Sequence, residues 1–330
     1  MKYTRSEAKS WVKKSLRGYI GVTTTPMMKN GEIDEAGLRH NVDFLLDLPG
    51  VKGLYMNSIY QEFWTMTLDE RKRVADIVIE AVDGRAPVIV GANHTSARDV
   101  VDLCRHAQAA GADLAMVWPP YYGVRTEEGV HAYYEYVAER VEIGMCIYST
   151  VLTELGHFLT PEAVEKLSKI DNICAVKEVS LSLSGYSQIM ERCGHLLSIS
   201  SPLEEYHLFG MAAYPDRVPN FLLGSSRPIY MQDKDKPYCK QFWDAVERKD
   251  IAAASVAMRQ ILAVSNALHS RYLAKGTHNV ALTKHITGLM GMAAGPVRPP
   301  MSAPPQEQID EAVAVLTEAG LLPKKLRMAS

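Results

Sequence analysis

Eight short apolar runs, each followed by a segment with helical periodicity, occupy the chain from about residue 19 to residue 225. The runs are continuous rather than alternating, which is typical of parallel strands buried on both faces. Eight strand-then-helix units with short connections predict an α/β protein, a closed (β/α)₈ TIM barrel, with an open doubly wound sheet as the competing arrangement. The runs are GYIGV (18–22), VKGLYM (51–56), APVIVGA (86–92), DLAMVW (113–118), GMCIY (144–148), ICAVK (173–177), LLSIS (196–200) and RVPNFLL (217–223).

Helix start signals separate several of these runs. Asp34 is placed to cap one helix, and Thr67 with Glu70 forms a capping box ahead of another. Thr160 and Pro161 have the residue types of an N-cap and a first helical position. Beyond about residue 235 the pattern predicts helices only. We therefore expect an N-terminal helical arm over 1–18, a barrel over 19–233, and a C-terminal helical extension packed on the barrel over 234–330.

Bulk composition excludes several classes of function. A net charge of −2 and a pI near 6.6 argue against a nucleic-acid partner, and the absence of an 18-residue apolar run argues against a membrane partner. The five cysteines are scattered, which suits reduced thiols in a cytoplasmic protein and offers no zinc framework. No P-loop, H-E-x-x-H or G-x-G-x-x-G motif occurs. The sequence therefore predicts neither a metal nor another cofactor.

The sixth apolar run ends on a charge, because Lys177 directly follows Val176. An unpaired ammonium group is costly to bury, and a lysine removed from water tends to lose its proton. Lys177 therefore leans out to solvent, pairs with Glu178, or supplies its amine to a site. Polar residues also follow the other runs, and the carboxyl ends of barrel strands meet at one mouth. These residues are Thr23, Thr24, Thr25, Asn57, Ser58, Asn93, His94, Tyr121, Tyr122, Tyr148, Ser200 and Ser201.

Tyr148 ends the fifth run, so the neighbouring strand is expected to place a phenol beside Lys177. A lysine in a partly apolar mouth has a lowered pKa and becomes a nucleophile toward carbonyl carbons. The protonated imine that results withdraws electrons and makes an adjacent C–C or C–H bond breakable, and a tyrosine within reach can move the proton. This is the chemistry of a class I, Schiff-base-forming lyase, and it needs no metal.

The chain resembles the dihydrodipicolinate synthase / N-acetylneuraminate lyase superfamily from about Tyr19 to Leu322. The resemblance rests on GVTTTPM, EFWTMTLDER, GRAPVIVGA, PPYYGVRTEEG and, most specifically, IYS and AVKE at the ends of the fifth and sixth runs. It implies Lys177 as the Schiff-base former, Tyr148 as the general acid and base, and Tyr122 as a proton relay across a tight dimer interface. It also implies a 2-oxo acid substrate such as pyruvate and a homotetramer built as a dimer of dimers.

The departures from the family pattern concern the substrate. Ser58-Ile59-Tyr60-Gln61-Glu62 stands where the family has G-T-T-G-E, so the side chain of Ile59 cannot relay a proton, although the backbone N–H groups of Ile59 and Tyr60 remain available to a carboxylate. Thr153 stands near the place of an arginine that binds the aldehyde in true dihydrodipicolinate synthases, which argues against lysine biosynthesis. The bulky and aromatic side chains in and after this segment suggest a bulkier, more apolar or aromatic substrate; they are Ile59, Tyr60, Phe63 and Trp64. The expected substrate-binding residues are Ile59, Tyr60, Gln61, Thr24, Thr150 and Ser201.

Three functions follow from this reading. The first is a lyase of the aldolase or hydratase-aldolase type; the second is an imine-dependent dehydratase, decarboxylase or cyclase. The third is a barrel that binds a metabolite without catalysis. Other polar residues have structural interpretations: Glu62 as an acceptor for backbone N–H groups, Arg227 in an ion pair, and Tyr148 and Tyr122, alternatively, as packed rings. The histidines near loop ends, His94, His157 and His207, are left out of the catalytic set.

Overall fold

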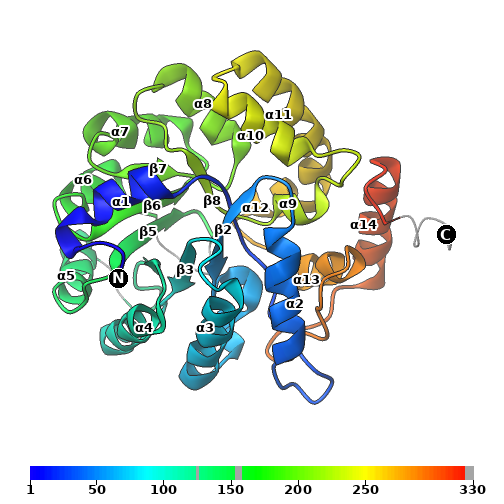
Figure 1. The fold of residues 1–330 in the computed structure, drawn as a ribbon, viewed down its shortest axis with the longest axis horizontal. Helices are drawn as coiled ribbons and strands as arrows, with labels where there is room; N and C mark the ends of the chain where they lie inside the picture. Colours follow the sequence, from blue (N-terminus) through cyan, green and yellow to red (C-terminus); the bar gives the residue numbers. More distant parts are fainter. Residues whose placement is uncertain (124–125, 153–157, 324–330) are drawn as a thin grey trace.

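Each of the eight apolar runs forms a strand. The structure is a computed structural model that describes residues 1–123, 126–152 and 158–323. All of the strand pairs in these residues are parallel, and the sheet curls around a central axis (Figure 1). The strands are β1 (Gly18–Gly21), β2 (Val51–Met56), β3 (Val88–Gly91), β4 (Leu114–Val117), β5 (Gly144–Thr150), β6 (Ile173–Val179), β7 (Ser198–Ser200) and β8 (Phe221–Ser225).

The sheet runs in the order β7-β6-β5-β4-β3-β2-β1-β8, so β7 and β8 face each other across the closure. Two hydrogen bonds join them there. Ser200 Oγ donates to the Phe221 carbonyl (2.8 Å), and the Leu223 N–H donates to the Ser201 carbonyl (3.1 Å). The prediction of a (β/α)₈ TIM barrel followed by a helical part is confirmed.

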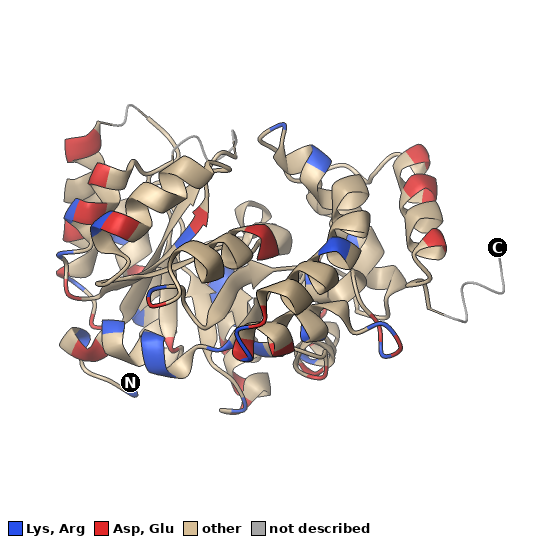
Figure 2. Ribbon diagram, turned by 90° about the horizontal axis from the view of Figure 1, so that it is seen from above, with Lys and Arg blue, Asp and Glu red and all other residues tan. Residues whose placement is uncertain are grey.

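Helices surround the barrel and continue beyond it. The α-helices are α1 (Ala8–Ser15), α2 (Glu35–Leu46), α3 (Leu68–Val82), α4 (Ala97–Ala110), α5 (Glu127–Ala138), α6 (Pro161–Leu167), α7 (Leu183–Cys193), α8 (Glu204–Ala213), α9 (Arg227–Tyr230), α10 (Tyr238–Glu247), α11 (Ile251–Ser265), α12 (Arg271–Leu273), α13 (Val280–Leu289) and α14 (Gln306–Glu318). Short helical turns are η1 (Arg5–Glu7), η2 (Ile59–Gln61), η3 (Phe63–Thr65) and the π-helical η4 (Asn266–Ser270). Lys, Arg, Asp and Glu lie mainly on the outer helices and loops (Figure 2).

The three helix N-caps predicted from the sequence are confirmed. Asp34 accepts a hydrogen bond from the Gly37 N–H at the start of α2 (2.8 Å). Thr67 and Glu70 make the reciprocal bonds of a capping box at α3. Thr160 caps α6, with proline in the first turn. These bonds satisfy N–H groups that have no partner inside the helix, which fixes where each helix begins.

The N-terminal segment closes the end of the barrel opposite the polar mouth. Helix α1 buries Ala8 and Val12 and packs against β6. The hydroxyl of Tyr3 donates to the Asp113 carbonyl and accepts from the Gly144 N–H, just before β4 and at the start of β5. The segment thus ties together the first residues of neighbouring strands, at the end of a barrel that contributes to stability rather than to chemistry.

The C-terminal helices pack on the barrel's side and around its mouth (Figure 1). Helix α11 packs against α10 and α8, and the helical stretch Ile251–Leu273 has a mean hydropathy of 1.4 over its most apolar window. By length and composition alone this stretch would also suit a membrane span, a property that core helices of soluble proteins share. Its buried residues include Ile261 and Val264, so it serves here as a packing element of the extension.

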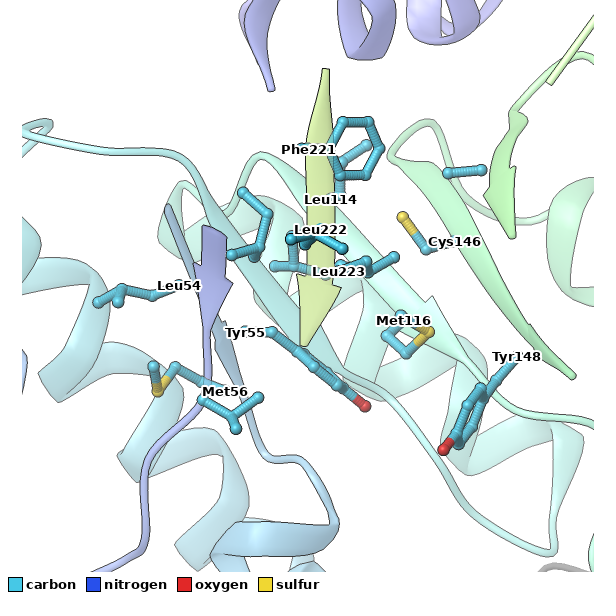
Figure 3. Close-up of a cluster of buried hydrophobic side chains, with 14 of the residues drawn as sticks. Leu54, Tyr55, Met56, Leu114, Met116, Cys146, Tyr148, Phe221, Leu222 and Leu223 are labelled. Atoms are coloured by element: carbon cyan, nitrogen blue, oxygen red, sulfur yellow. The ribbon is translucent and has the colours of Figure 1, made fainter. Parts of the chain in front are cut away.

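The barrel interior is filled by side chains at its base and becomes polar at its mouth. Figure 3 shows Leu222 and Leu223 of β8 among the apolar side chains of the interior, with Met116 of β4 nearby. Tyr55 of β2 and Tyr148 of β5 also point inward, and their hydroxyl groups lie beyond the carboxyl end of β8. The apolar layers therefore support a floor of phenol groups at the end where barrel enzymes carry their sites.

Candidate active site

Lys177 is buried at the carboxyl half of β6, with 3% of its surface exposed. Its Nζ lies 4.8 Å from the centroid of the Tyr148 ring and 5.4 Å from that of the Tyr55 ring. Its contact with the Gly224 carbonyl, at 3.4 Å, is at the long limit of a hydrogen bond. Burial lowers the pKa of the Lys177 ammonium from 10.5 to about 7. About half of the amine is therefore unprotonated at neutral pH.

Neither of the alternative placements of Lys177 occurs. The amine does not lean into solvent, and it does not pair with Glu178, because successive side chains of a strand point to opposite faces. Glu178 instead accepts a hydrogen bond from the Ser180 N–H (2.8 Å), and burial raises the pKa of its carboxyl group. Lys177 thus points into the barrel and Glu178 toward the surrounding helices.

Tyr148 is the register partner of Lys177 across the β5–β6 ladder. Only 2% of its surface is exposed, and its ring packs against the Trp118 ring at 5.3 Å between centroids. The indole N–H of Trp118 donates to the hydroxyl of Tyr55 (3.3 Å), which fixes the second phenol of the floor. The amine therefore lies against two aromatic rings. Figure 3 shows the hydroxyl groups of these two rings at the same end of the barrel.

The loop after β2 brings Tyr60 to the site in an unexpected way. Its hydroxyl lies 3.1 Å from Nε2 of His269, and its ring lies 5.2 Å from that of His278. Ile59, next to it, lines a cavity. Gln61 turns back on its own loop, where its side-chain oxygen accepts from the Asn57 N–H and its carbonyl accepts from Thr25. Ile59 and Tyr60 thus face the mouth, whereas Gln61 holds the loop.

The hydroxyl groups expected to bind substrate already have local hydrogen-bond partners. Thr24 Oγ1 lies 3.3 Å from Thr287 Oγ1. Thr150 accepts from the Leu152 N–H (3.2 Å), and Ser201 accepts from the Leu203 N–H (3.4 Å). All of the three expected residues, Thr24, Thr150 and Ser201, are buried at strand ends. Their part in substrate binding stays a prediction.

Tyr122 lies apart from the amine in the single chain, with 84% of its surface exposed. Its neighbour Tyr121 is half-buried and faces the cavity at the mouth. Thr153 and His157 lie outside the described residues. The other two histidines considered from the sequence have structural surroundings: His94 lies 3.1 Å from an Asp99 oxygen, and His207 packs on the aromatic side chains of α10.

An apolar cavity of about 420 Å³ lies at the same end of the barrel. Lys177 and Tyr148 are not among its lining residues, but its Phe63 packs on Trp118, which packs on Tyr148. Its walls come from the loop after β2, the loop after β4 and the C-terminal extension. Phe63 is the centre of the aromatic wall, with its ring 5.0 Å from that of Trp118 and 5.5 Å from that of Trp64. The lining residues are Ile59, Phe63, Trp64, Tyr121, His278, Asn279, Val280, Ala281, Met301 and Ser302. This composition suits an apolar or aromatic ligand group.

Buried ion pairs involve two residues that were considered from the sequence, Glu62 and Arg227. Glu62 pairs with Lys284 of α13 (2.8 Å), and its other oxygen accepts from the Arg298 N–H (3.3 Å). The expected backbone contact of Glu62 is thus present, but the main partner is a lysine that the sequence did not indicate. Arg227 pairs with Glu204 and with Glu205 (2.8 Å), as expected for a structural ion pair. Lys284 differs from Lys177 in having a carboxylate partner.

His269 and His278 were missed in the sequence. His269 is on the π-helical turn η4, and His278 immediately precedes the N-cap of α13. Burial and the charge of Lys177 lower the pKa of His278 to about 3. Burial, together with His278, Arg227 and Lys177, lowers the pKa of His269 well below its usual range. Both rings are therefore neutral at neutral pH and lie within the electrostatic reach of Lys177.

No group of three or more metal-binding side chains converges within residues 1–123, 126–152 and 158–323. The arrangement at the mouth is one of an amine that is about half unprotonated at neutral pH, phenol groups and neutral imidazoles. Such groups act as nucleophiles and proton carriers toward carbonyl compounds.

Comparisons with known proteins agree with this fold. The sequence model of the dihydrodipicolinate synthetase family matches residues 15–319. A 4-hydroxy-tetrahydrodipicolinate synthase of Geotalea uraniireducens (strain Rf4) is 30% identical over 307 residues, covering 93% of this chain and 99% of the relative. The crystal structure of dihydrodipicolinate synthase from Aquifex aeolicus superimposes with a TM-score of 0.82 at 24% identity, covering 94% of this chain and 100% of that one. YagE, an Escherichia coli K12 prophage protein solved in complex with pyruvate, gives 0.80 at 23% identity, covering 93% and 99%.

The fold and these relatives make the chain a (β/α)₈ enzyme of the lyase class, of the class I aldolase type. It belongs to the dihydrodipicolinate synthetase family.

Proposed function

We propose that this enzyme forms an imine between Lys177 and a 2-oxo acid such as pyruvate, and then makes or breaks a C–C bond with a bulky or aromatic carbonyl partner. The observation that carries the proposal is the amine itself, which is buried, has a pKa near 7 and lies against the ring of Tyr148. An unprotonated amine is the form that attacks a ketone. The pyruvate bound by the related YagE supports the choice of a 2-oxo acid.

The steps follow from the positions of the groups. The lone pair of Lys177 Nζ adds to the ketone carbon, and one of the two nitrogen protons passes to the oxygen. Tyr148 supplies the second proton, which lets the oxygen leave as water. The iminium that remains loses a proton from C3 to give an enamine. The enamine carbon then attacks the partner's carbonyl carbon, and water finally releases the product from Lys177. In the reverse direction the same groups cleave the C–C bond.

The cavity at the mouth supports a bulky or aromatic partner. Phe63, Trp64 and Tyr121 form one wall, and Met301 faces the same space. Aromatic side chains stack on flat apolar groups with a gain of about 1 kcal/mol per well-placed pair. The volume, about 420 Å³, lies within the usual range for small-molecule sites.

The loop after β2 offers donors for the carboxylate of the 2-oxo acid. We include in the proposal the backbone N–H groups of Ile59 and Tyr60, which have no acceptor among the described residues. The Ser58 hydroxyl beside them is buried and also has no partner there. A carboxylate would satisfy these donors, whereas an apolar ligand would leave them unpaired at a cost of about 1–3 kcal/mol each.

Reductive trapping tests the proposal. Borohydride added with pyruvate is expected to fix one adduct per chain, and peptide mapping is expected to find it on Lys177. Lys284 is an internal control, because this lysine is equally buried but paired with Glu62, so it should carry no adduct. Lys177→Ala should trap nothing and lose turnover. The proposal is wrong if no 2-oxo acid in a broad panel gives an adduct, or if Lys177→Ala keeps full activity.

The exposed phenol of Tyr122 leads to a proposal about assembly. We propose a homotetramer in which a second chain covers Tyr122 and receives its hydroxyl at the mouth, in a cytoplasmic setting that keeps the five buried thiols reduced. Light scattering should give the mass of four chains. Tyr122→Phe should lower turnover without changing that mass. A monomer with full activity would contradict this assembly.

A further inference from the structure

Three polar rings from distant parts of the chain meet near the carboxyl ends of the strands. Tyr60 comes from the loop after β2, His269 from the turn η4, and His278 from the segment before α13. The Tyr60 hydroxyl lies 3.1 Å from Nε2 of His269, and the two imidazole rings lie 5.1 Å apart at 38°. A π-helical turn contains one more residue than an α-helical one, and such turns are frequent at functional sites. The turn therefore marks His269 as a residue placed for more than packing.

The cluster is electrostatically joined to the imine-forming groups. The charge of Lys177 contributes to the lowered pKa of both histidines. Burial raises the pKa of the Tyr60 phenol, and repulsion from Tyr230 and Tyr148 adds to the effect. The second ring nitrogen of His269, Nδ1, is buried without a partner among the described residues. A neutral imidazole that has a nitrogen without a partner and lies beside a phenol can carry protons.

We propose that Tyr60 and His269 form a proton relay that removes the C3 proton of the Lys177 iminium, taking the place of the hydroxyl relay that Ile59 cannot provide. The inference rests on the proposed imine chemistry. Tyr148 then donates the proton for the loss of water at C2, and Tyr60 removes the proton from C3. His278 acts as a positioning residue, because its ring packs on both Tyr60 and His269.

The transfer is balanced in atoms and charge. The Tyr60 oxygen takes the proton from C3 as its own proton passes to Nε2 of His269, so the phenol ends neutral and the imidazole becomes imidazolium. The C3–H electrons form the C2=C3 bond, and the electrons of the C2=N bond return to nitrogen as a lone pair. One positive charge thereby moves from the Lys177 nitrogen to His269, which removes the part of the lowered His269 pKa that comes from Lys177; burial, the largest cause, stays.

Exchange of the pyruvate methyl protons in D₂O, followed by ¹H NMR, tests the relay separately from imine formation. Tyr60→Phe and His269→Gln are each expected to slow exchange about 100-fold, within the range for loss of a general base. Borohydride trapping on Lys177 should reach the same extent as in the wild type. Glutamine can still hydrogen-bond to Tyr60 but does not accept an additional proton at neutral pH, so His269→Gln separates proton transfer from positioning. The double variant should be no slower than either single variant.

Matched controls are available in the same chain. His207→Gln changes another buried histidine, which packs on α10 and whose pKa is lowered to about 4 by burial, without a contribution from Lys177. Tyr133→Phe removes another buried phenol that has no partner among the described residues. Both controls should exchange at the wild-type rate. Exchange in His269→Gln within 3-fold of wild type, or a parallel fall of exchange and trapping, would overturn the relay and leave the imine proposal standing. A wild-type enzyme that traps no 2-oxo acid would overturn both.

Discussion

Gly224 controls the space available to the Lys177 amine. It lies in β8 with a φ of +80°, and a Cβ added there would approach Lys177 Nζ to 2.7 Å and Tyr55 Cδ1 to 3.1 Å. Ordinary van der Waals contact begins at 3.4 Å, so Gly224→Ala must displace the amine by at least 3.4 − 2.7 = 0.7 Å. Nucleophile displacements of about 1 Å can cost about 100-fold in rate. We therefore expect Gly224→Ala to slow imine trapping by roughly 100-fold.

The positive φ also costs stability, and a control separates this effect from the crowding. Gly84 has a φ of +70° with no atom within 4 Å of its added Cβ. Alanine at either position should lower the free energy of unfolding by about 1–2 kcal/mol, because of the left-handed backbone alone.

The assay compares the two variants under identical conditions. The rate of reductive trapping with saturating pyruvate is measured by intact mass, and thermal unfolding is measured in parallel. Gly84→Ala should lose stability and keep its trapping rate, whereas Gly224→Ala should lose both. Equal trapping rates in the two variants would refute the reasoning, because the amine would then not lie where the Gly224 carbonyl and the two phenol rings enclose it.

Three further predictions concern the charge and walls of the site. The trapping rate should rise through pH 7 and level off above about pH 8, since Lys177 has a pKa near 7; a rise that continues to pH 10 would contradict this burial. Lys177→Met should stabilise the fold at pH 7 by up to about 4 kcal/mol, because a lysine whose folded pKa lies 3.5 units below its ordinary value opposes folding at neutral pH. Between pH 7 and 10.5 the unfolded wild type binds more protons than the folded one, so wild-type stability rises and this gain should shrink by about 1 kcal/mol per pH unit; a gain independent of pH in chemical denaturation would disagree. Trp64→Ala should raise KM for an aromatic partner about 10-fold, equivalent to about 1.4 kcal/mol, and change KM for pyruvate less; equal effects would place the partner elsewhere.

The parts of the fold that could be predicted are those fixed by local chemistry. Asp34, Thr67 and Thr160 satisfy helix N–H groups within three residues of themselves, so their role is written in the adjacent sequence. The eight apolar runs likewise report strands that helices cover. Lys177 was visible for the same reason, since a charge at the end of an apolar strand stands out without any knowledge of its neighbours.

The parts that could not be predicted depend on contacts between distant segments. His269 and His278 lie in the helical extension, and only the folded chain brings them to Tyr60. Lys284 appears in the sequence as an ordinary helix residue, although it is the partner of Glu62. Gln61 follows Tyr60 directly, yet the Gln61 side chain turns back onto the loop, where its oxygen accepts a hydrogen bond from the Asn57 N–H. The residue type at one position does not indicate which distant residue it will contact in the folded chain.

The roof of the cavity comes from the end of the chain, with residues 278–281 and 301–302 covering a mouth whose strands end at Ser225. Synthesis on the ribosome proceeds from the N-terminus, so the eighth strand leaves the exit tunnel well before this roof does. During that interval all eight barrel strands have been synthesised, but the residues that cover the cavity have not yet left the ribosome. The cavity is therefore completed only after all eight strands have emerged, and the side chains that cover the mouth are added after the barrel strands.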